Sequence, residues 1–387
     1  MIGQLVLDYS TDTSKRYRSF RNFIRGISRE STKVTYVKFL RAFMKFHKIE
    51  DYDEMTSFSA QKIDEMLEDY IDELEGRGVK GITIRTNLAG IERFFEMNDC
   101  IWHKSRIRKS IKRDDGIPGG SEPITTKEIK RMLECTKSLR IKALVHFLAS
   151  TGMRPAGLVD PVLKIKHLMP MPRPNDTTNQ KWCYAVRVYD ESKEGYWSFL
   201  TPEATEALDN FFAWRENRGE KITQESPIFI NIENNKHTRF QHITDKNTRF
   251  IIDNLIRQSA LKRKKVSDRR FDKSIIYMFR KRFNTTLKLN NEVNSNIAEK
   301  LMAHKKGLDG TYLQPTQEEC YKEFIKAIPE LTIDDSERKQ IELDKFKQEK
   351  IESQDQSQKI EELNSKIEML THKMDLFSKT TESKLRD

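Results

Sequence analysis

The chain contains 387 residues, of which 33% are charged and 36% are hydrophobic, and its formal net charge is +11. This length allows two or three domains, and with no run of about 18 apolar residues we expect no membrane-spanning helix. Its four cysteines are too widely spaced in the sequence for a zinc-knuckle motif. The first thirty residues do not resemble a signal peptide, so we expect a cytoplasmic protein with reduced thiols.

The positive charge is concentrated in the body of the chain. Residues 334–387 contain 11 basic and 14 acidic side chains, a net of −3, so the preceding 333 residues carry +14. A basic body favours a polyanionic partner such as nucleic acid, although many soluble proteins are basic without binding one.

Residues 1–113 predict a bundle of helices. The start is a polar, basic arm, which either lies along phosphates or is solvated. Apolar side chains then recur at steps of three and four residues in three segments, around Phe39, Leu67 and Ile91, which predicts amphipathic helices. A fourth, strongly basic helix is expected from Ile101 to about Lys112.

Basic side chains on the third and fourth of these helices are candidate phosphate contacts. The alternative is a solvated helical face. The residues concerned are Arg85, Arg106, Arg108 and Lys109. Residues 114–123, which are rich in Gly and Pro, predict a linker that would let two lobes close around a duplex.

Residues 124–333 predict a second domain of mixed structure. We expect Thr126 to cap a short helix, and an apolar helix from about Leu139 to Ala149 runs into Thr151-Gly152-Met153-Arg154. Two segments rich in strand formers, 182–189 and 196–200, flank a polar turn that contains Lys193. This pattern predicts a β-hairpin.

The following residues predict a helix, a loop and a basic cluster. The helix runs from Pro202 to about Trp214, and 218–247 is expected to be a polar surface excursion. The cluster includes Lys262, Arg263 and Lys264, which either contact phosphates or form a solvated run.

The stretch from 277 to 312 combines the residue types that phosphoryl transfer to a tyrosine requires. It contains Tyr277-Met278-Phe279-Arg280, Leu301-Met302-Ala303-His304 and Gly310-Thr311-Tyr312. A phenol is a weak nucleophile at its usual pKa of ~10. Negative charge develops on the phosphate oxygens in the transition state, and guanidinium groups bind such oxygens bidentately.

Together with Thr-Gly-x-Arg upstream, this stretch resembles the active site of the tyrosine recombinase (phage integrase) family. There His-x-x-Arg is followed by Leu-Gly-His and then a Tyr eight or nine residues later. Three positions depart from the pattern: Tyr277 replaces His, Ala303 replaces Gly, and Gly157 stands where a Glu is often found. Either that acidic group is missing here or another residue, such as Asp160, supplies it. The Tyr-x-x-Arg form resembles the branch found in archaea and archaeal mobile elements.

The resemblance implies a mainly α-helical fold with a small β-hairpin or sheet, in which a helical core-binding domain precedes the catalytic domain. It implies site-specific recombination of double-stranded DNA through a 3′-phosphotyrosine, without metal, ATP or other cofactor. The protein is then expected to be nucleoid-associated and to form a homo-oligomer, a tetramer on synapsed DNA. A type IB topoisomerase and a non-catalytic DNA-binding protein on the same scaffold remain alternatives. The implied catalytic residues are Arg154, Lys193, Tyr277, Arg280, His304 and Tyr312, with Tyr321 as a rival nucleophile.

Residues 334–387 predict a long charged helix that ends in a short coiled coil. Its apolar residues step by three and four, as a heptad seam does. They are Ile360, Leu363, Ile367, Leu370, Met374 and Phe377. This seam either joins two protomers, binds a partner protein or folds back on the body of the chain.

Overall fold

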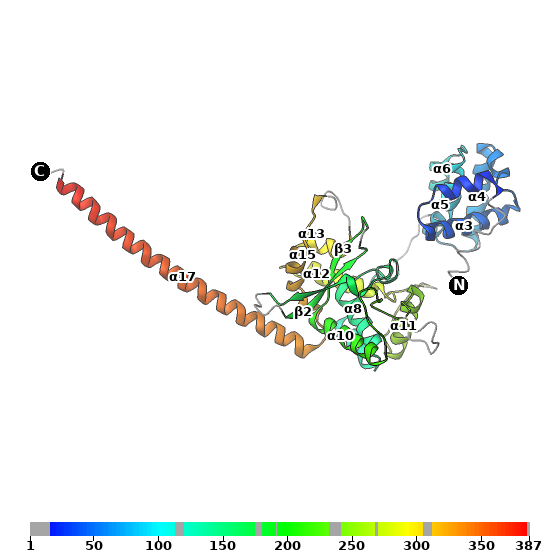
Figure 1. Cartoon of the computed structure of the whole chain (residues 1–387). Coiled ribbons are helices and arrows are strands. Elements are labelled where there is room, and N and C mark those ends of the chain that lie inside the picture. The colour runs from blue at the N-terminus through cyan, green and yellow to red at the C-terminus, as the bar shows by residue number, and fades with distance from the viewer. Residues whose placement is uncertain are drawn as a thin grey trace. The chain divides into compact units, whose positions relative to one another are not determined.

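In a computed structural model of the chain, the residues described are 16–112, 120–174, 180–190, 192–231, 241–267, 270–304 and 312–384. The chain divides into two compact units, Met1–Ile117 and Pro118–Asp387 (Figure 1). The mainly helical fold with a small antiparallel sheet is confirmed. Among these residues, no helix has both the length and the apolar composition needed to cross a bilayer.

The first unit is a bundle of helices, and the predicted amphipathic helices are present in it. The expectation of a polar arm was wrong for residues 18–25, because Phe20 and Phe23 of this segment are buried against Tyr52 and Phe94. The helices are α2 (Arg18–Arg25), α3 (Glu30–His47), α4 (Ala60–Gly76), α5 (Gly81–Met97) and α6 (Lys104–Ser110).

The core of this unit depends on close packing between α3 and α5. Phe43 of α3 contacts Tyr70 and Phe95 edge-on. Gly90 of α5 faces the backbone of Tyr36, and a Cβ at Gly90 would lie 3.0 Å from the Tyr36 carbonyl oxygen. A larger residue at position 90 would therefore separate the two helices.

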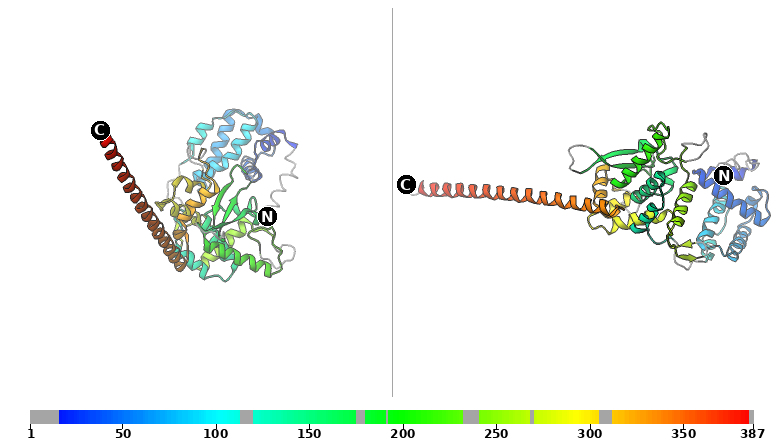
Figure 2. Two further views of the ribbon diagram at one scale, coloured as in Figure 1. Left: turned by 60° about the vertical axis from the view of Figure 1, so that its left-hand side comes forward. Right: turned by 90° about the horizontal axis from the view of Figure 1, so that it is seen from below.

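The second unit places helices around a three-stranded antiparallel sheet (Figures 1 and 2). The predicted hairpin is formed by β2 (Lys181–Val188) and β3 (Tyr196–Phe199), with Ala185 opposite Phe199. An additional strand, β1 (Leu168–Pro172), pairs with β2. Its two prolines hid it from prediction, although an edge strand tolerates them.

The helices of this unit differ in detail from the prediction. Helix α7 is capped by Thr125 rather than Thr126, because Thr125 and Glu128 form a reciprocal capping box. The predicted surface excursion is partly wrong, since Phe229 and Ile243 belong to the core. The helices are α7 (Thr126–Glu134), α8 (Leu139–Thr151), α9 (Ala156–Val159), α10 (Pro202–Asn217), α11 (Asp245–Gln258), α12 (Tyr277–Leu289), α13 (Ser295–Lys300), α15 (Gln317–Lys326) and α16 (Ile328–Leu331), with a small ribbon of β4 (Lys265–Ser267) and β5 (Arg270–Phe271).

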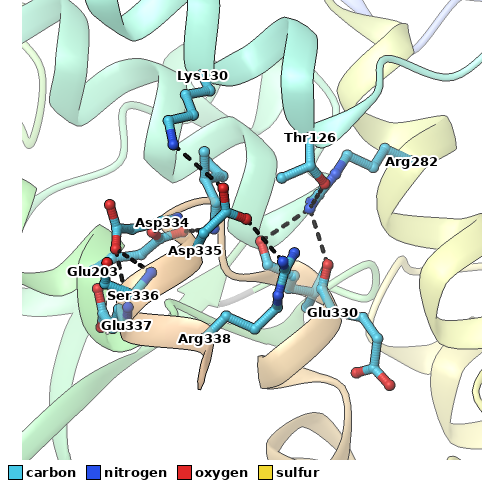
Figure 3. A network of polar contacts seen from close by, with 12 residues as sticks. Thr126, Lys130, Glu203, Arg282, Glu330, Asp334, Asp335, Ser336, Glu337 and Arg338 are labelled. Atoms are coloured by element: carbon cyan, nitrogen blue, oxygen red, sulfur yellow. Dashed lines mark hydrogen bonds and ion pairs between the residues drawn. The ribbon is translucent and has the colours of Figure 1, made fainter. Parts of the chain in front are cut away.

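The long C-terminal helix α17 (Asp335–Lys384) begins in a network of polar contacts (Figure 3). Glu203 of α10 accepts hydrogen bonds from the backbone N–H groups of Ile333 and Asp334, at 2.7 and 3.0 Å. The Asp334 side chain then caps the first turn of α17. Lys130 of α7 forms an ion pair with Asp335 at 3.3 Å. The first turn of α17 is therefore fixed to α7 and α10.

Candidate active site

The site begins at the end of α8, where the chain must turn sharply. Gly152 terminates the helix with φ +54°, and a Cβ at this position would lie 2.5 Å from the Cβ of Phe283. Only glycine fits both the left-handed backbone and the approach of α12. The turn that follows presents Arg154, whose side chain is half-buried.

Arg280, on α12, joins three segments that are distant in sequence. Its side chain is 7% exposed. Nη1 donates a hydrogen bond of 2.9 Å to the carbonyl of Gly152, and Nη2 donates one of 2.7 Å to the carbonyl of Met302. The guanidinium therefore holds the end of α8 and the end of α13 at a fixed distance from α12.

His304 is placed by the way α13 ends. Ala303 adopts φ +55°, and the backbone N–H of His304 reaches back to the carbonyl of Glu299 at 2.9 Å. This is the six-to-one hydrogen bond of a Schellman motif, in which a glycine usually occupies the left-handed position. Ala303 thus adopts a conformation that glycine prefers.

The two ring nitrogens of His304 have different partners. Nε2 lies 2.7 Å from Nη2 of Arg280, and Nδ1 lies 2.5 Å from Oε2 of Glu299. Because a guanidinium has only donors, Nε2 must accept, and Nδ1 must therefore carry the proton that is donated to Glu299. The imidazole is held as the Nδ1–H tautomer.

Charges around this histidine explain its protonation state. Burial lowers the pKa of His304, the hydrogen bond to Glu299 opposes this, and the positive charges of Arg280 and Arg154 lower it further. Burial alone would raise the pKa of Glu299, but hydrogen bonds from Lys288, at 2.8 Å, and from His304 bring it to about 2. The carboxylate is ionised and the imidazole is neutral near pH 7.

Electrostatic coupling shows that the arginines share one region. Burial lowers the pKa of Arg280, and the charge of Arg154 lowers it further, whereas Tyr196, Tyr277 and Tyr189 raise it. Arg280 therefore feels the charge of Arg154 and of three phenols, and it hydrogen-bonds the imidazole of His304. Such a concentration of cations would bind a phosphate group.

Tyr189 lies next to Gly157, the position at which the sequence resemblance leads us to expect a Glu. A Cβ at Gly157 would lie 3.8 Å from the Tyr189 hydroxyl and 3.1 Å from Cγ1 of Val188. Burial raises the pKa of Tyr189, and Arg154 lowers it. The phenol of Tyr189, which directly follows β2, thus feels the charge of Arg154, while Asp160, the substitute considered above, is exposed.

The remaining predicted site residues are at the surface. Tyr277 begins α12 and is 42% exposed, and Lys193 is exposed in the β2–β3 turn. Tyr312 is 78% exposed, and 305–311 lie outside the described residues. The rival Tyr321 is buried and donates a hydrogen bond to the carbonyl of Pro172 at 2.7 Å. The structure thus places Arg280 in contact with His304, and the charges of Arg154 and Tyr277 act on Arg280.

Several of the predicted DNA-contacting residues have partners within their own unit. In the first unit, Arg106 pairs with Asp64 and Glu68, and Arg108 pairs with the buried Glu92. Arg85 donates to the Arg108 carbonyl at 2.9 Å. Their guanidiniums therefore stabilise α6, while Lys109 is exposed.

The basic cluster of the second unit is divided in the same way. Arg263 is largely buried, donates to the carbonyl of Lys273 at 3.0 Å and lies over the ring of Phe271. Lys262 and Lys264 are exposed. Arg263 therefore fixes the β-ribbon, and its two neighbours present charge to solvent.

Sequence reasoning missed Glu299, Tyr189 and Tyr196. Glu299 lies five residues before His304, the spacing of a Schellman bond, and that spacing is the signal that would have revealed it. Tyr196 belongs to β3 and Tyr189 follows the end of β2, and no local pattern links them to Arg154. No group of three or more His, Cys, Asp or Glu side chains able to hold a metal ion occurs within the described ranges.

Comparison with known proteins gives structural similarity only. No protein-family model and no curated protein matches the chain. It is similar to the Tn1549 transposon integrase in complex with a circular intermediate DNA (14% identity, TM-score 0.48, 79% of this chain and 98% of that one). It is also similar to a lambda integrase tetramer bound to a Holliday junction (15%, 0.46, 78% and 79%) and to XerA recombinase (16%, 0.35, 79% and 95%).

Proposed function

We propose that this chain is a site-specific DNA recombinase of the tyrosine recombinase type, in the Tyr-x-x-Arg form. The observation that supports this most is that Arg280 hydrogen-bonds both His304 and the carbonyl of Gly152, two residues before Arg154, and that the charge of Arg154 acts on both side chains. Their spacing in the sequence matches the family's motifs, and their spatial grouping is what binding a single phosphate requires.

In the proposed reaction, the phenol oxygen of Tyr312 attacks the scissile phosphorus and releases its proton to solvent. The bond between phosphorus and the 5′ oxygen breaks, and Lys193 donates a proton to that oxygen. The product is a 3′-phosphotyrosine and a free 5′-hydroxyl. A 5′-hydroxyl from another strand reverses the step, so no ATP is consumed.

The cations would act on the non-bridging oxygens. Arg280 uses three of its N–H groups for Gly152, Met302 and His304. Among the described residues, Nε–H and the second Nη1–H have no hydrogen-bond partner and are left for the phosphate. Because the carbonyls of Gly152 and Met302 already fix the guanidinium, it needs little reorganisation when charge develops in the transition state.

We propose that α17 joins two copies of the chain. Ile360 and Ile367 fall at heptad position a and Leu363 and Leu370 at d, and all four are at least 58% exposed. β-Branched residues at a with leucine at d favour a parallel, two-stranded coiled coil.

The flanking charges support the same orientation. Lys359 and Lys366 occupy position g, whereas Asn364 and Thr371 occupy e. An antiparallel pair would bring g against g and oppose lysines, while a parallel pair brings g against the neutral e residues.

A pool of nicked duplexes of randomised sequence tests the proposal without a known target. The nick lets the leaving strand diffuse away, so a covalent intermediate accumulates. We expect an adduct that survives denaturant with the wild type and with Tyr321→Phe, but not with Tyr312→Phe. Loss of supercoils from plasmid by isolated protomers, with no joining of two sites, would favour a topoisomerase. DNA binding with no adduct would overturn the enzyme assignment.

A further inference from the structure

The hydrogen bonds of His304 conflict with its role in the proposed reaction. To contact a non-bridging oxygen, Nε2 must donate a hydrogen bond, because a phosphate oxygen only accepts. In the structure, however, Nε2 accepts from Arg280. The imidazole must therefore change its protonation when the phosphate arrives.

A change of tautomer does not resolve the conflict. A neutral ring protonated at Nε2 would leave Nδ1 as an acceptor, facing the ionised carboxylate of Glu299 at 2.5 Å. Two acceptors at that distance repel each other. Because the backbone N–H of His304 also donates a hydrogen bond of 2.9 Å to the carbonyl of Glu299, the imidazole and the carboxylate are held close together.

We propose that Glu299 is a positioning residue that makes His304 a cation when the scissile phosphate binds, so that DNA engagement takes up one proton from solvent. The proton is added to Nε2, while Nδ1–H continues to donate to Glu299. This inference rests on the function proposed above.

The surrounding charges suit such an exchange. Arg154 from the α8–α9 turn and Arg280 from α12 oppose a positive imidazole in the free protein, and Glu299 from α13 favours it. Lys288 of α12 contacts Glu299 at 2.8 Å and keeps that carboxylate ionised. A bound phosphate diester adds a negative charge, which offsets one guanidinium and removes part of the repulsion.

Glu299→Gln provides the sharpest test. The glutamine amide can donate to Nδ1, so a neutral imidazole protonated at Nε2 becomes possible and no proton is required. A merely structural role for Glu299 would change stability but would not alter the count of protons taken up.

The experiment uses the full chain and a duplex recovered from the randomised pool. Proton uptake on DNA binding is measured by titration calorimetry in buffers of different ionisation enthalpy. The pH is near 8, about 1.5 units above the usual histidine pKa. All proteins compared also carry Tyr312→Phe, which prevents cleavage. We expect uptake with Glu299 present, none with Glu299→Gln or His304→Asn, and unchanged uptake with His47→Asn in the other unit. In the Tyr312 enzyme, adduct formation should decrease at high pH, and this decrease should be lost in Glu299→Gln.

A second measurement needs no variant at Glu299. Nitrogen-15 spectra of the His304 ring should show one protonated nitrogen in the free protein and two in the DNA complex. Absence of an adduct on every duplex would reject the proposed function itself. An adduct accompanied by a ring that stays neutral, or by equal proton uptake in Glu299→Gln, would reject only the role of Glu299.

Discussion

Nη2 of Arg280 lies 2.7 Å from Nε2 of His304, so the two groups that would bind the phosphate also bind each other. The same guanidinium holds the carbonyls of Gly152 and Met302. Arg280 is therefore expected to contribute to stability as well as to chemistry, whereas Arg154, half-buried in a turn, is expected to contribute mainly to chemistry.

Substituting these two arginines separately tests this difference. In Arg280→Lys, the lysine has fewer N–H donors than arginine and cannot reach the carbonyls of Gly152 and Met302 together. Because a buried carbonyl is then left without a partner, we expect a loss of about 1–3 kcal/mol in the free energy of unfolding. Arg154→Lys should change it by less than about 0.5 kcal/mol. Urea unfolding provides the measurement, and equal losses in both variants would contradict the bridging role of Arg280.

Ala303→Gly should stabilise the second unit. The left-handed backbone at φ +55° costs an alanine about 1 kcal/mol, and glycine relieves this strain. Part of the gain is lost because glycine has greater conformational entropy in the unfolded chain. We expect a small rise in Tm. Ala298→Gly, inside α13 and buried, is the matched control and should lower it. A decrease with Ala303→Gly would show that the methyl group contributes more by packing than it costs in strain.

The start of α17 should weaken as pH rises. Burial raises the pKa of Glu337 to about 7, and Glu203, Glu206 and Asp334 raise it as well. Since the folded state holds this proton more tightly than the unfolded chain does, its stabilising effect is complete below pH 4.5 and is lost as pH rises to about 7.

Glu337→Gln should abolish that loss. With allowance for solvent screening, we expect the variant to be more stable than wild type above neutral pH, by no more than about 1 kcal/mol, and to match it in acid. Thermal unfolding at both pH values measures the difference. An identical pH dependence in the two proteins would refute the assignment.

Self-association through α17 should depend on the seam rather than on exposed apolar area. Leu370 and Met369 are adjacent and similarly exposed, at 60% and 59%, but only Leu370 lies on the seam. Leu370→Ser should weaken the dimer at least tenfold, about 1.4 kcal/mol, and Met369→Ser should leave it intact. Sedimentation equilibrium measures both. Equal weakening would point to non-specific association.

Periodicity and spacing predicted much of this molecule, for reasons visible in particular residues. The apolar steps around Phe39, Leu67 and Ile91 predicted helices because one face of each helix is buried. The hairpin was predicted because its strands alternate. By contrast, α2 was missed because its arginines outnumber its two buried phenylalanines, and β1 because of its prolines.

The candidate site was predictable only where it follows local motifs. The positions of Arg154, Arg280 and His304 were predicted from a family resemblance, and their proximity is a tertiary fact. The partnership of His304 with Glu299 depends on a positive φ at Ala303, and the space beside the Tyr189 hydroxyl depends on the absence of a side chain at Gly157. Neither can be derived from hydrophobic pattern.

The most direct test of the central claim is to identify the residue that carries the DNA. The covalent adduct is treated with nuclease and protease, and the nucleotide-bearing peptide is sequenced by mass spectrometry. We predict a nucleotide joined through its 3′ phosphate to Tyr312. A nucleotide on Tyr277, Tyr321 or any other side chain, or the absence of a nucleotide-bearing peptide from protein that binds DNA, would contradict the account.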